Sequence, residues 1–379
     1  MRILIVGGGV AGLTLAAKLR QQGREPVVVE KSAEYRDVGY GIGLYPMGSC
    51  VLHGLGVYDE FVARGMECYR YEVADHTGEV LQGLDMSVLT DNAGPMILLN
   101  RSELINVLRR ACRNVAIRMN TTVESILQTS ESVEVTFSDR TAAEFDLVVA
   151  CDGIHSQMRR RIFAKPEVFD TGWTVWTWWG REGLFAPHLV REYWGHGSFF
   201  GFYPVPGRCM FVAGLPNEAA PDQSAPESVR ATIASALGEL PLRVCEVRTG
   251  IEDAESLYAW PMADVRARQW HSGRVALCGD AAAAFLPTAG IGASCALRSA
   301  AALADELSRA DAAHVSSALE LYAKRCRKVV EANQDDSRSA ARYMFVESRV
   351  LGWGRDQIIK HYPADRVVRQ IIQSMREPF

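Results

Sequence analysis

No stretch of this sequence is long and apolar enough to cross a bilayer. The opening apolar run, residues 2–6, has the length of a strand, and no cleavage site follows it. A net charge of −4 and an isoelectric point near 6.1 give no basic surface of the kind that attracts nucleic acid or an anionic membrane. We therefore expect a cytoplasmic protein with no nucleic-acid partner and no stable membrane insertion.

The residues that commonly hold metals or form disulfides lack the usual spacing. The nine cysteines are an odd number without a CxxC pair, and the eight histidines include no HxxxH. We therefore expect no metal site, and we interpret the cysteines as small buried apolar residues.

The sequence opens with a strand, a glycine-rich turn, a helix and a second strand. The turn reads GxGxxG as Gly7, Gly9 and Gly12, and Glu30 closes the second strand. In a dinucleotide site the first glycine permits a tight turn, the second lets the backbone approach a pyrophosphate, and the third lets helix and strand pack closely. The acid accepts hydrogen bonds from ribose hydroxyls and disfavours a 2′-phosphate, so the tightly held nucleotide is expected not to be NADP.

The middle of the chain differs from both ends. From about 170 to 215 it is aromatic, rich in strand-forming residues and punctuated by turns, which is typical of an antiparallel sheet. A strand–loop–helix pattern returns near 275–305, and the residues after 293 are mostly helix-patterned. We therefore expect the first and last parts to form one nucleotide-binding α/β domain, which a substrate domain interrupts.

Two further motifs follow buried strands. CDGIHSQMRR, residues 151–160, places Asp152 and Gly153 directly after a strand. CGDAAAAFLPTAGIGA, residues 278–293, holds one charged side chain, Asp280, in an apolar run that leads to a proline and two spaced glycines. A buried carboxylate without a partner is costly, so we expect Asp280 either to bind a ligand or to cap a helix.

A helix over residues 100–112 contributes another polar candidate. We expect Ser102 to be its N-cap, with Arg101 at its start. A surface arginine at a helix N-terminus is electrostatically unfavourable, which favours a ligand for Arg101.

In this order, the three motifs and the helix around Arg101 resemble the single-component FAD-dependent aromatic hydroxylases of the para-hydroxybenzoate hydroxylase type (class A flavoprotein monooxygenases). The resemblance covers nearly the whole chain. It implies an α/β fold in which a β-sheet substrate domain interrupts a Rossmann-like FAD-binding domain of the GR2 type, with C-terminal helices. The implied boundaries are 1–75, 97–170 and 265–330 for the FAD-binding domain, 76–96 and 171–264 for the substrate domain, and 331–379 for the C-terminal helical segment.

The resemblance also implies the chemistry. NAD(P)H reduces FAD, O₂ adds at flavin C4a, and the resulting hydroperoxide hydroxylates a small aromatic or polycyclic substrate. No histidine or cysteine lies in a recognisable flavinylation motif, so FAD is expected to be non-covalent, with NADH or NADPH as a transient co-substrate. The chain is expected to be a monomer or homodimer.

A flavin-dependent halogenase, a reductase on the same fold and a non-catalytic flavin-binding protein remain the alternatives. GWTVWTWW, residues 172–179, departs from the GWxWxIP signature of the halogenases. No second GxGxxG is present, which disfavours a disulfide reductase with its own NAD domain.

Roles for individual residues follow from the resemblance. Asp280 binds a ribityl hydroxyl, Arg101 contacts the phosphate or ribityl region, and Asp152 with Gly153 lies near the pyrophosphate. Pro287 sets the loop beside the isoalloxazine, where the following backbone N–H groups meet the flavin N1–C2 edge. The expected cofactor-binding residues are Gly7, Gly9, Gly12, Glu30, Lys31, Gly43, Arg101, Asp152, Gly153, Asp280, Pro287, Gly290, Gly292 and Ala293.

Aromatic residues of the middle segment are expected to line the substrate pocket. Alternate strand positions share a face, so Trp176 groups with Trp178, and Phe200 with Phe202. Each is equally compatible with a plain sheet core. The expected set is Trp176, Trp178, Phe200, Phe202 and Tyr203. Because these strands are apolar, we expect a substrate without charge near its reacting ring, unless Arg181, Arg191 or Arg208 points inward.

Overall fold

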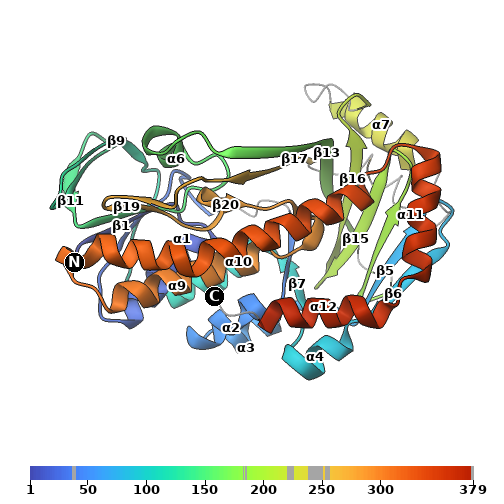
Figure 1. Cartoon of the computed structure of the whole chain (residues 1–379), viewed down its shortest axis with the longest axis horizontal. Coiled ribbons are helices and arrows are strands. Elements are labelled where there is room, and N and C mark those ends of the chain that lie inside the picture. Colours follow the sequence, from blue (N-terminus) through green and yellow to red (C-terminus); the bar gives the residue numbers. More distant parts are fainter. Residues whose placement is uncertain are drawn as a thin grey trace.

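The computed structural model describes residues 1–35, 40–181, 183, 186–219, 226–237, 251 and 257–376. Its parallel sheet, its larger mixed sheet and its C-terminal helices confirm the predicted α/β class (Figure 1). Residues 238–250 and 252–256 of the predicted substrate domain lie outside the described residues, as do the last three residues of the chain.

The N-terminal strand lies in the interior of the parallel sheet. The strand order is β18-β19-β12-β1-β2-β8, and every pair is parallel except β18 with β19. β1 and β12 are buried along their whole length because apolar side chains on both faces pack into the main core. The strands are β1 (Ile3–Val6), β2 (Val27–Val29), β8 (Ala116–Arg118), β12 (Leu147–Ala150), β18 (His271–Ser272) and β19 (Val275–Leu277).

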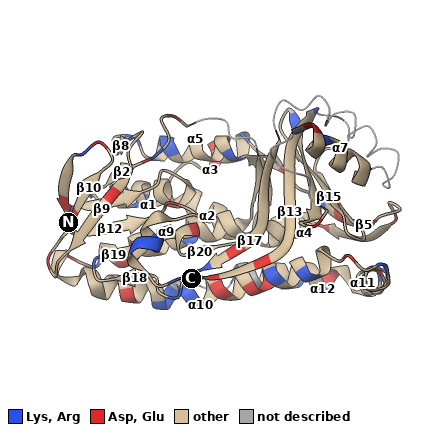
Figure 2. Cartoon of the chain, turned by 90° about the horizontal axis from the view of Figure 1, so that it is seen from above, with Lys and Arg blue, Asp and Glu red and all other residues tan. Residues whose placement is uncertain are grey.

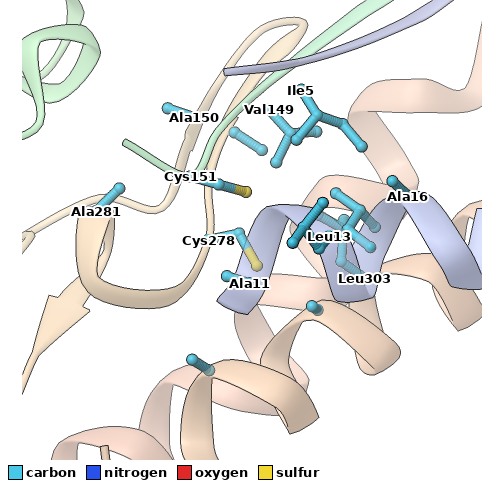
Figure 3. Close-up of a cluster of buried hydrophobic side chains, with 14 of the residues drawn as sticks. Ile5, Ala11, Leu13, Ala16, Val149, Ala150, Cys151, Cys278, Ala281 and Leu303 are labelled. Atoms are coloured by element: carbon cyan, nitrogen blue, oxygen red, sulfur yellow. The ribbon is translucent and has the colours of Figure 1, made fainter. Parts of the chain in front are cut away.

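Several helices pack into the core beside this sheet, among them α1 (Val10–Gln21), α5 (Arg101–Ala111) and α9 (Gly292–Ser308). Figure 3 shows small and branched side chains of α1 beside those of the strands and of α9, with the thiols of Cys151 and Cys278 among them. Of the cysteines in the described part of the chain, Cys50 is exposed and the rest are buried free thiols.

The start of α5 differs from the sequence prediction. Asn100, not Ser102, is the N-cap, because Asn100 has extended backbone and its side-chain oxygen accepts the N–H of Ser102 at 3.1 Å. Ser102 already lies in the helix.

The larger sheet forms the other half of the molecule (Figure 1). Its order is β20-β17-β13-β16-β15-β14-β5-β6, and its pairs are antiparallel except β14 with β5. β5 already belongs to this sheet, although it precedes the boundary predicted after residue 75. The strands are β5 (Arg70–Asp75), β6 (Val80–Asp85), β13 (Glu167–Arg181), β14 (Leu189–Trp194), β15 (Phe199–Val205), β16 (Arg208–Pro216), β17 (Tyr258–Arg266) and β20 (Ala283–Ala284).

Shorter elements complete both halves. β3 and β4 pair with β7, and β9, β10 and β11 form a separate antiparallel sheet. The strands are β3 (Gly41–Leu44), β4 (Met66–Glu67), β7 (Ile97–Asn100), β9 (Val123–Gln128), β10 (Val133–Phe137) and β11 (Ala142–Phe145). The helices are α2 (Pro46–Gly54), α3 (Tyr58–Ala63), α4 (Ser87–Ala93), α6 (Gln157–Ile162) and α7 (Pro226–Leu237).

The C-terminal helices join the two halves. α10 (Val315–Met344) runs alongside both, so the boundary predicted between residues 330 and 331 falls inside one continuous helix (Figure 1). α11 (Arg349–His361) and α12 (Ala364–Arg376) follow along the larger sheet. Figure 2 shows Lys or Arg positions and Asp or Glu positions interspersed along α10. Within the described residues, no helix combines the length and the apolar character needed to cross a membrane.

Candidate cofactor and substrate site

A cavity of about 1100 Å³ is lined by both halves of the molecule. Its wall combines the carboxyl ends of β1 and β12, the segment from β20 to α9, one face of the larger sheet, and parts of α10 and α12. Every predicted cofactor residue except Gly12 lines it. These are Gly7, Gly9, Glu30, Lys31, Gly43, Arg101, Asp152, Gly153, Asp280, Pro287, Gly290, Gly292 and Ala293.

The three motif glycines occupy different environments. Gly7 has φ +109°, and a side chain there would collide with the carbonyl of Cys151. A side chain at Gly12 would collide with the carbonyl of Gly7, so Gly12 permits the close packing of α1 on the turn and does not face the cavity. At Gly9 nothing lies within 4 Å of an added Cβ, which leaves the backbone open to a ligand in the cavity.

Glu30 stabilises the same turn from the end of β2. Its carboxylate accepts the backbone N–H of Gly8 at 2.7 Å and that of Ser32 at 2.9 Å. Beside it lies Tyr35, whose buried hydroxyl has no hydrogen-bond partner among the described residues. Burial and the charge of Glu30 raise the pKa of Tyr35 to about 12. Glu30 therefore fixes the turn and presents its remaining acceptor capacity to the cavity.

Asp280 lies in the 3₁₀ turn η1 (Gly279–Ala281), whose N-cap is Cys278, so Asp280 does not cap a helix. Burial raises its pKa to about 6, and the nearby charges of Arg101 and Arg159 oppose that rise. The carboxylate is accessible from the cavity, although protein surrounds it elsewhere. Asp280 is thus an acceptor at the cavity surface that a hydroxyl in the cavity can reach.

Arg159 is a positioning residue whose role the sequence did not reveal. It is 3% exposed, and its guanidinium donates to the carbonyl of Ala281 at 2.7 Å, inside η1. It also donates to the carbonyl of Ile154. Arg159 therefore ties the segment after β12 to the turn that carries Asp280.

Asp152 and Gly153 connect β12 to α6. One oxygen of Asp152, Oδ2, accepts the N–H groups of Gln157 at 2.8 Å and Met158 at 3.2 Å. The other, Oδ1, is buried without a partner among the described residues. Since both residues line the cavity and Gly153 has open space around it, this acceptor is available to a bound molecule.

The start of α9 forms the remaining wall. The turn η2 (Pro287–Ala289) ends at Gly290, which has φ +65°. α9 then begins at Gly292 without a side-chain cap. The first N–H groups of a helix have no intrahelical acceptor and carry partial positive charge, so this end of α9 favours an anionic or carbonyl group in the cavity.

The prediction for the aromatic pocket is wrong for four of its five residues. Trp176, Trp178, Phe200 and Phe202 are buried in a core cluster with Val229 and Ile233 of α7, on the opposite face of the sheet. Tyr203 does line the cavity. The paired residues share faces as predicted, but the alternate residues of β13 and β15 face the cavity.

Sequence reasoning also missed a carboxylate. Glu192 on β14 lines the cavity and is 3% exposed, with Tyr71 of β5 and Thr177 of β13 on the same wall. The signal that singled out Asp280, a lone charge in an apolar run, is absent here, because Arg191 stands beside Glu192 in the strand LVREYW.

These residues fit FAD. The open backbone at Gly9, the unpartnered Oδ1 of Asp152, the acceptor Asp280 and the uncapped start of α9 offer contacts suited to a pyrophosphate, to hydroxyls and to a flavin carbonyl edge. Within the described residues, no group of three or more histidine, cysteine or acidic side chains is arranged to hold a metal ion.

We predict that Glu30→Ala weakens FAD binding about tenfold, because it removes an acceptor for the ribose and the anchor of the N–H of Gly8. Fluorescence titration of the apoprotein with FAD measures the affinity. Glu25→Ala is the matched control, since Glu25 is exposed and pairs only loosely with Arg20 at 3.5 Å. An unchanged FAD affinity in the Glu30 variant would contradict a nucleotide site at this turn.

Asp280→Asn should change the pH dependence of stability. The pKa of Asp280 is about 6 in the folded protein against 3.8 ordinarily, so the folded state binds this proton more tightly. The contribution of protonated Asp280 to the free energy of unfolding is therefore full below pH 3.8 and is lost as the pH rises through about 6. In the apoprotein, Asn should match Asp at or below pH 3.8, where the carboxyl is largely protonated, and should melt higher by about 2 °C at pH 7.5, while binding FAD more weakly. A pH-independent difference in Tm would contradict the raised pKa of Asp280.

Comparison with known proteins agrees with this geometry. Residues 1–337 match the family model described as FAD binding domain. The chain is 31% identical over 312 residues to 2-heptyl-3-hydroxy-4(1H)-quinolone synthase of Pseudomonas aeruginosa, covering 80% of each chain. It is also 31% identical over 311 residues to 3-amino-4-hydroxybenzoate 2-monooxygenase of Streptomyces cremeus, covering 78% of this chain and 76% of the relative.

Among solved structures, Klebsiella pneumoniae HpxO complexed with FAD and uric acid superposes with a TM-score of 0.89 at 21% identity, over 99% of this chain and 96% of HpxO. This likeness supports the fold. The relatives favour a monooxygenase over the halogenase, reductase and non-catalytic alternatives. The chain therefore belongs to the FAD-binding-domain family and is a flavin-dependent monooxygenase.

Proposed function

We propose that this monooxygenase hydroxylates a small, uncharged aromatic compound. The observation that carries the proposal is the distribution of charge in the cavity wall. Among its described residues, the cations are Lys31 and Arg101, and both lie at the nucleotide end. Lys31 follows Glu30 in the sequence, and Arg101 lies near Asp280.

The wall formed by the larger sheet is apolar apart from Glu192 and a few hydroxyls. Its apolar members are Leu84, Val175, Phe199, Val205, Met210, Val212, Trp260 and Met262. Burying a substrate carboxylate there without a cation would cost several kcal/mol, on the order of the penalty for an unpaired charge. A neutral ring is the ligand that this wall accepts.

The arginines that border the sheet do not change this balance. Arg191 pairs with Glu72, and Arg208 lies over the ring of Trp179 at 4.0 Å. Arg181 is exposed. None of the three lines the cavity.

The relatives supply two candidate substrate classes. One is named for a 4(1H)-quinolone product, a neutral heterocycle, and the other for an aminohydroxybenzoate, which carries a carboxylate. The cavity wall favours the first class for this chain.

FAD and the residues of the cavity wall have separate roles in the proposed reaction. Bound FAD supplies hydride acceptance from NAD(P)H and the activation of O₂. We assign to the chain the fixing of the ribose end at Glu30, the ribityl chain at Asp280 and the flavin edge at the start of α9. The apolar wall orients the substrate and excludes water.

A substrate panel tests the proposal. The holoenzyme is given 4(1H)-quinolone, 1-naphthol, 4-hydroxybenzoate or 3-amino-4-hydroxybenzoate, and NAD(P)H oxidation and hydroxylated product are measured. We expect the neutral compounds to stimulate oxidation and the benzoates to have little effect. Preferential stimulation by the benzoates would overturn the proposal.

Gly292→Val should uncouple the reaction. An added Cβ at Gly292 lies 3.2 Å from the Cβ of Phe285, which lines the cavity, so a branched side chain displaces that ring and blocks backbone approach. With FAD in excess, we expect the ratio of hydrogen peroxide formed to NAD(P)H consumed to rise several-fold. Gly292→Ala is the graded control and should rise less. Wild-type coupling in the valine variant would show that the start of α9 does not meet the flavin.

A further inference from the structure

A polar cluster interrupts the apolar wall of the larger sheet. Glu192 accepts a hydrogen bond from the Tyr203 hydroxyl at 2.6 Å on Oε1 and one from the indole N–H of Trp194 at 2.8 Å on Oε2. Tyr71 also hydrogen-bonds to Glu192. Glu192, Tyr203 and Tyr71 all line the cavity, and the contacts described for the cofactor end use none of them.

The sheet register brings a further hydroxyl onto the same row. Thr177 pairs with Val212, Val212 with Gly201, and Gly201 with Glu192, across four neighbouring strands. Directly paired residues of antiparallel strands share a face, so these positions all face the cavity. The hydroxyl of Thr177 is buried and has no hydrogen-bond partner among the described residues. An unpartnered hydroxyl in a cavity wall points to a polar group on the ligand.

Gly201 gives Tyr203 its position. A Cβ at Gly201 would lie 2.9 Å from the Tyr203 hydroxyl oxygen and 2.9 Å from a ring carbon. The Tyr203 ring therefore lies over the bare backbone of Gly201, and this pose lets its hydroxyl reach Glu192.

The hydrogen bonds of the cluster all run toward Glu192. A carboxylate only accepts hydrogen bonds, so each tyrosine commits its proton to Glu192 and leaves oxygen lone pairs for other donors. Burial raises the pKa of Glu192, and the hydrogen bonds from Tyr203, Tyr71 and Trp194 oppose that rise. No lysine or arginine among the described lining residues belongs to this wall to supply a competing donor.

We propose that Glu192, acting through Tyr203 and Tyr71, makes this wall an acceptor subsite that selects substrates bearing an N–H or phenolic O–H group. The inference rests on the proposed function and deepens it, since it specifies which neutral aromatics the cavity prefers. Glu192 is a positioning residue here, because it fixes the direction of the tyrosine protons.

Matched ligand pairs test the subsite. Calorimetry on the FAD-loaded enzyme measures Kd for 4(1H)-quinolone against its N-methyl derivative, and for 1-naphthol against 1-methoxynaphthalene. In the wild type we expect the donor-bearing member of each pair to bind about tenfold more tightly, as expected for one buried hydrogen bond.

Two conservative variants test whether the ligand preference comes from hydrogen bonding or from side-chain size. Tyr203→Phe keeps the ring and removes the acceptor, so the preference should fall to about twofold. In Glu192→Gln the amide can donate to the tyrosine oxygens and turn their protons toward the cavity, so the methylated ligands should bind as well as their parents or better. Tyr193→Phe is the control, because Tyr193 lies on the same strand but packs into the α7-facing cluster. It should keep the wild-type ratio.

The outcomes are distinct. A donor preference that persists unchanged in both Tyr203→Phe and Glu192→Gln would be steric and would overturn the subsite. If Glu192→Gln does not fold, the Tyr203→Phe ratio alone decides. If no neutral ring binds to the wild-type holoenzyme while the benzoates do, the proposed function itself fails, and the subsite with it.

Discussion

The close approach of three backbone segments at the carboxyl edge of the parallel sheet determines where a nucleotide can bind. The β1–α1 turn meets the end of β12 because Gly7 has no side chain to strike the carbonyl of Cys151. The η1 turn meets α1 because Gly279, at φ +61°, leaves room for Ala11. With larger residues at these points the segments would separate. Gly9, Asp152 and Asp280 reach one cavity through this packing.

The two ends of that cavity differ in electrostatic character, and the difference divides their roles. The nucleotide end combines carboxylates, two cations and the uncapped start of α9, which suits a ligand with phosphates, hydroxyls and a carbonyl edge. The sheet end holds an apolar surface with a single acceptor cluster around Glu192. A polar cofactor and a neutral aromatic substrate can therefore share one space without competing for the same contacts.

Much of the nucleotide end could be predicted from the sequence, because its residues are conspicuous there. A glycine that tolerates no side chain, or a lone carboxylate such as Asp280 in an apolar run, has few structural explanations. The substrate end could not be predicted in the same way. β13 and β15 are apolar on both faces, so alternation groups Trp176 with Trp178 but cannot say whether that group faces the cavity or α7.

Two other differences have similar causes. β5, which ends at the boundary predicted after residue 75, pairs with its neighbour β6 and with β14, more than 100 residues later, and local patterning carries no information on the distant partner. Glu192 went unnoticed because its partners, Tyr71 and Tyr203, come from separate strands, and their convergence depends on the register of the sheet.

A crystal structure of the holoenzyme with 4(1H)-quinolone or 1-naphthol tests the central claim most directly. The account predicts a flavin whose ribityl chain contacts Asp280 and whose ring edge meets the start of α9. It predicts the substrate ring against the face of the sheet that carries Thr177 and Tyr203. A ring bound on the face that carries Trp176 and Trp178, or a flavin that leaves Asp280 without a contact, would contradict it.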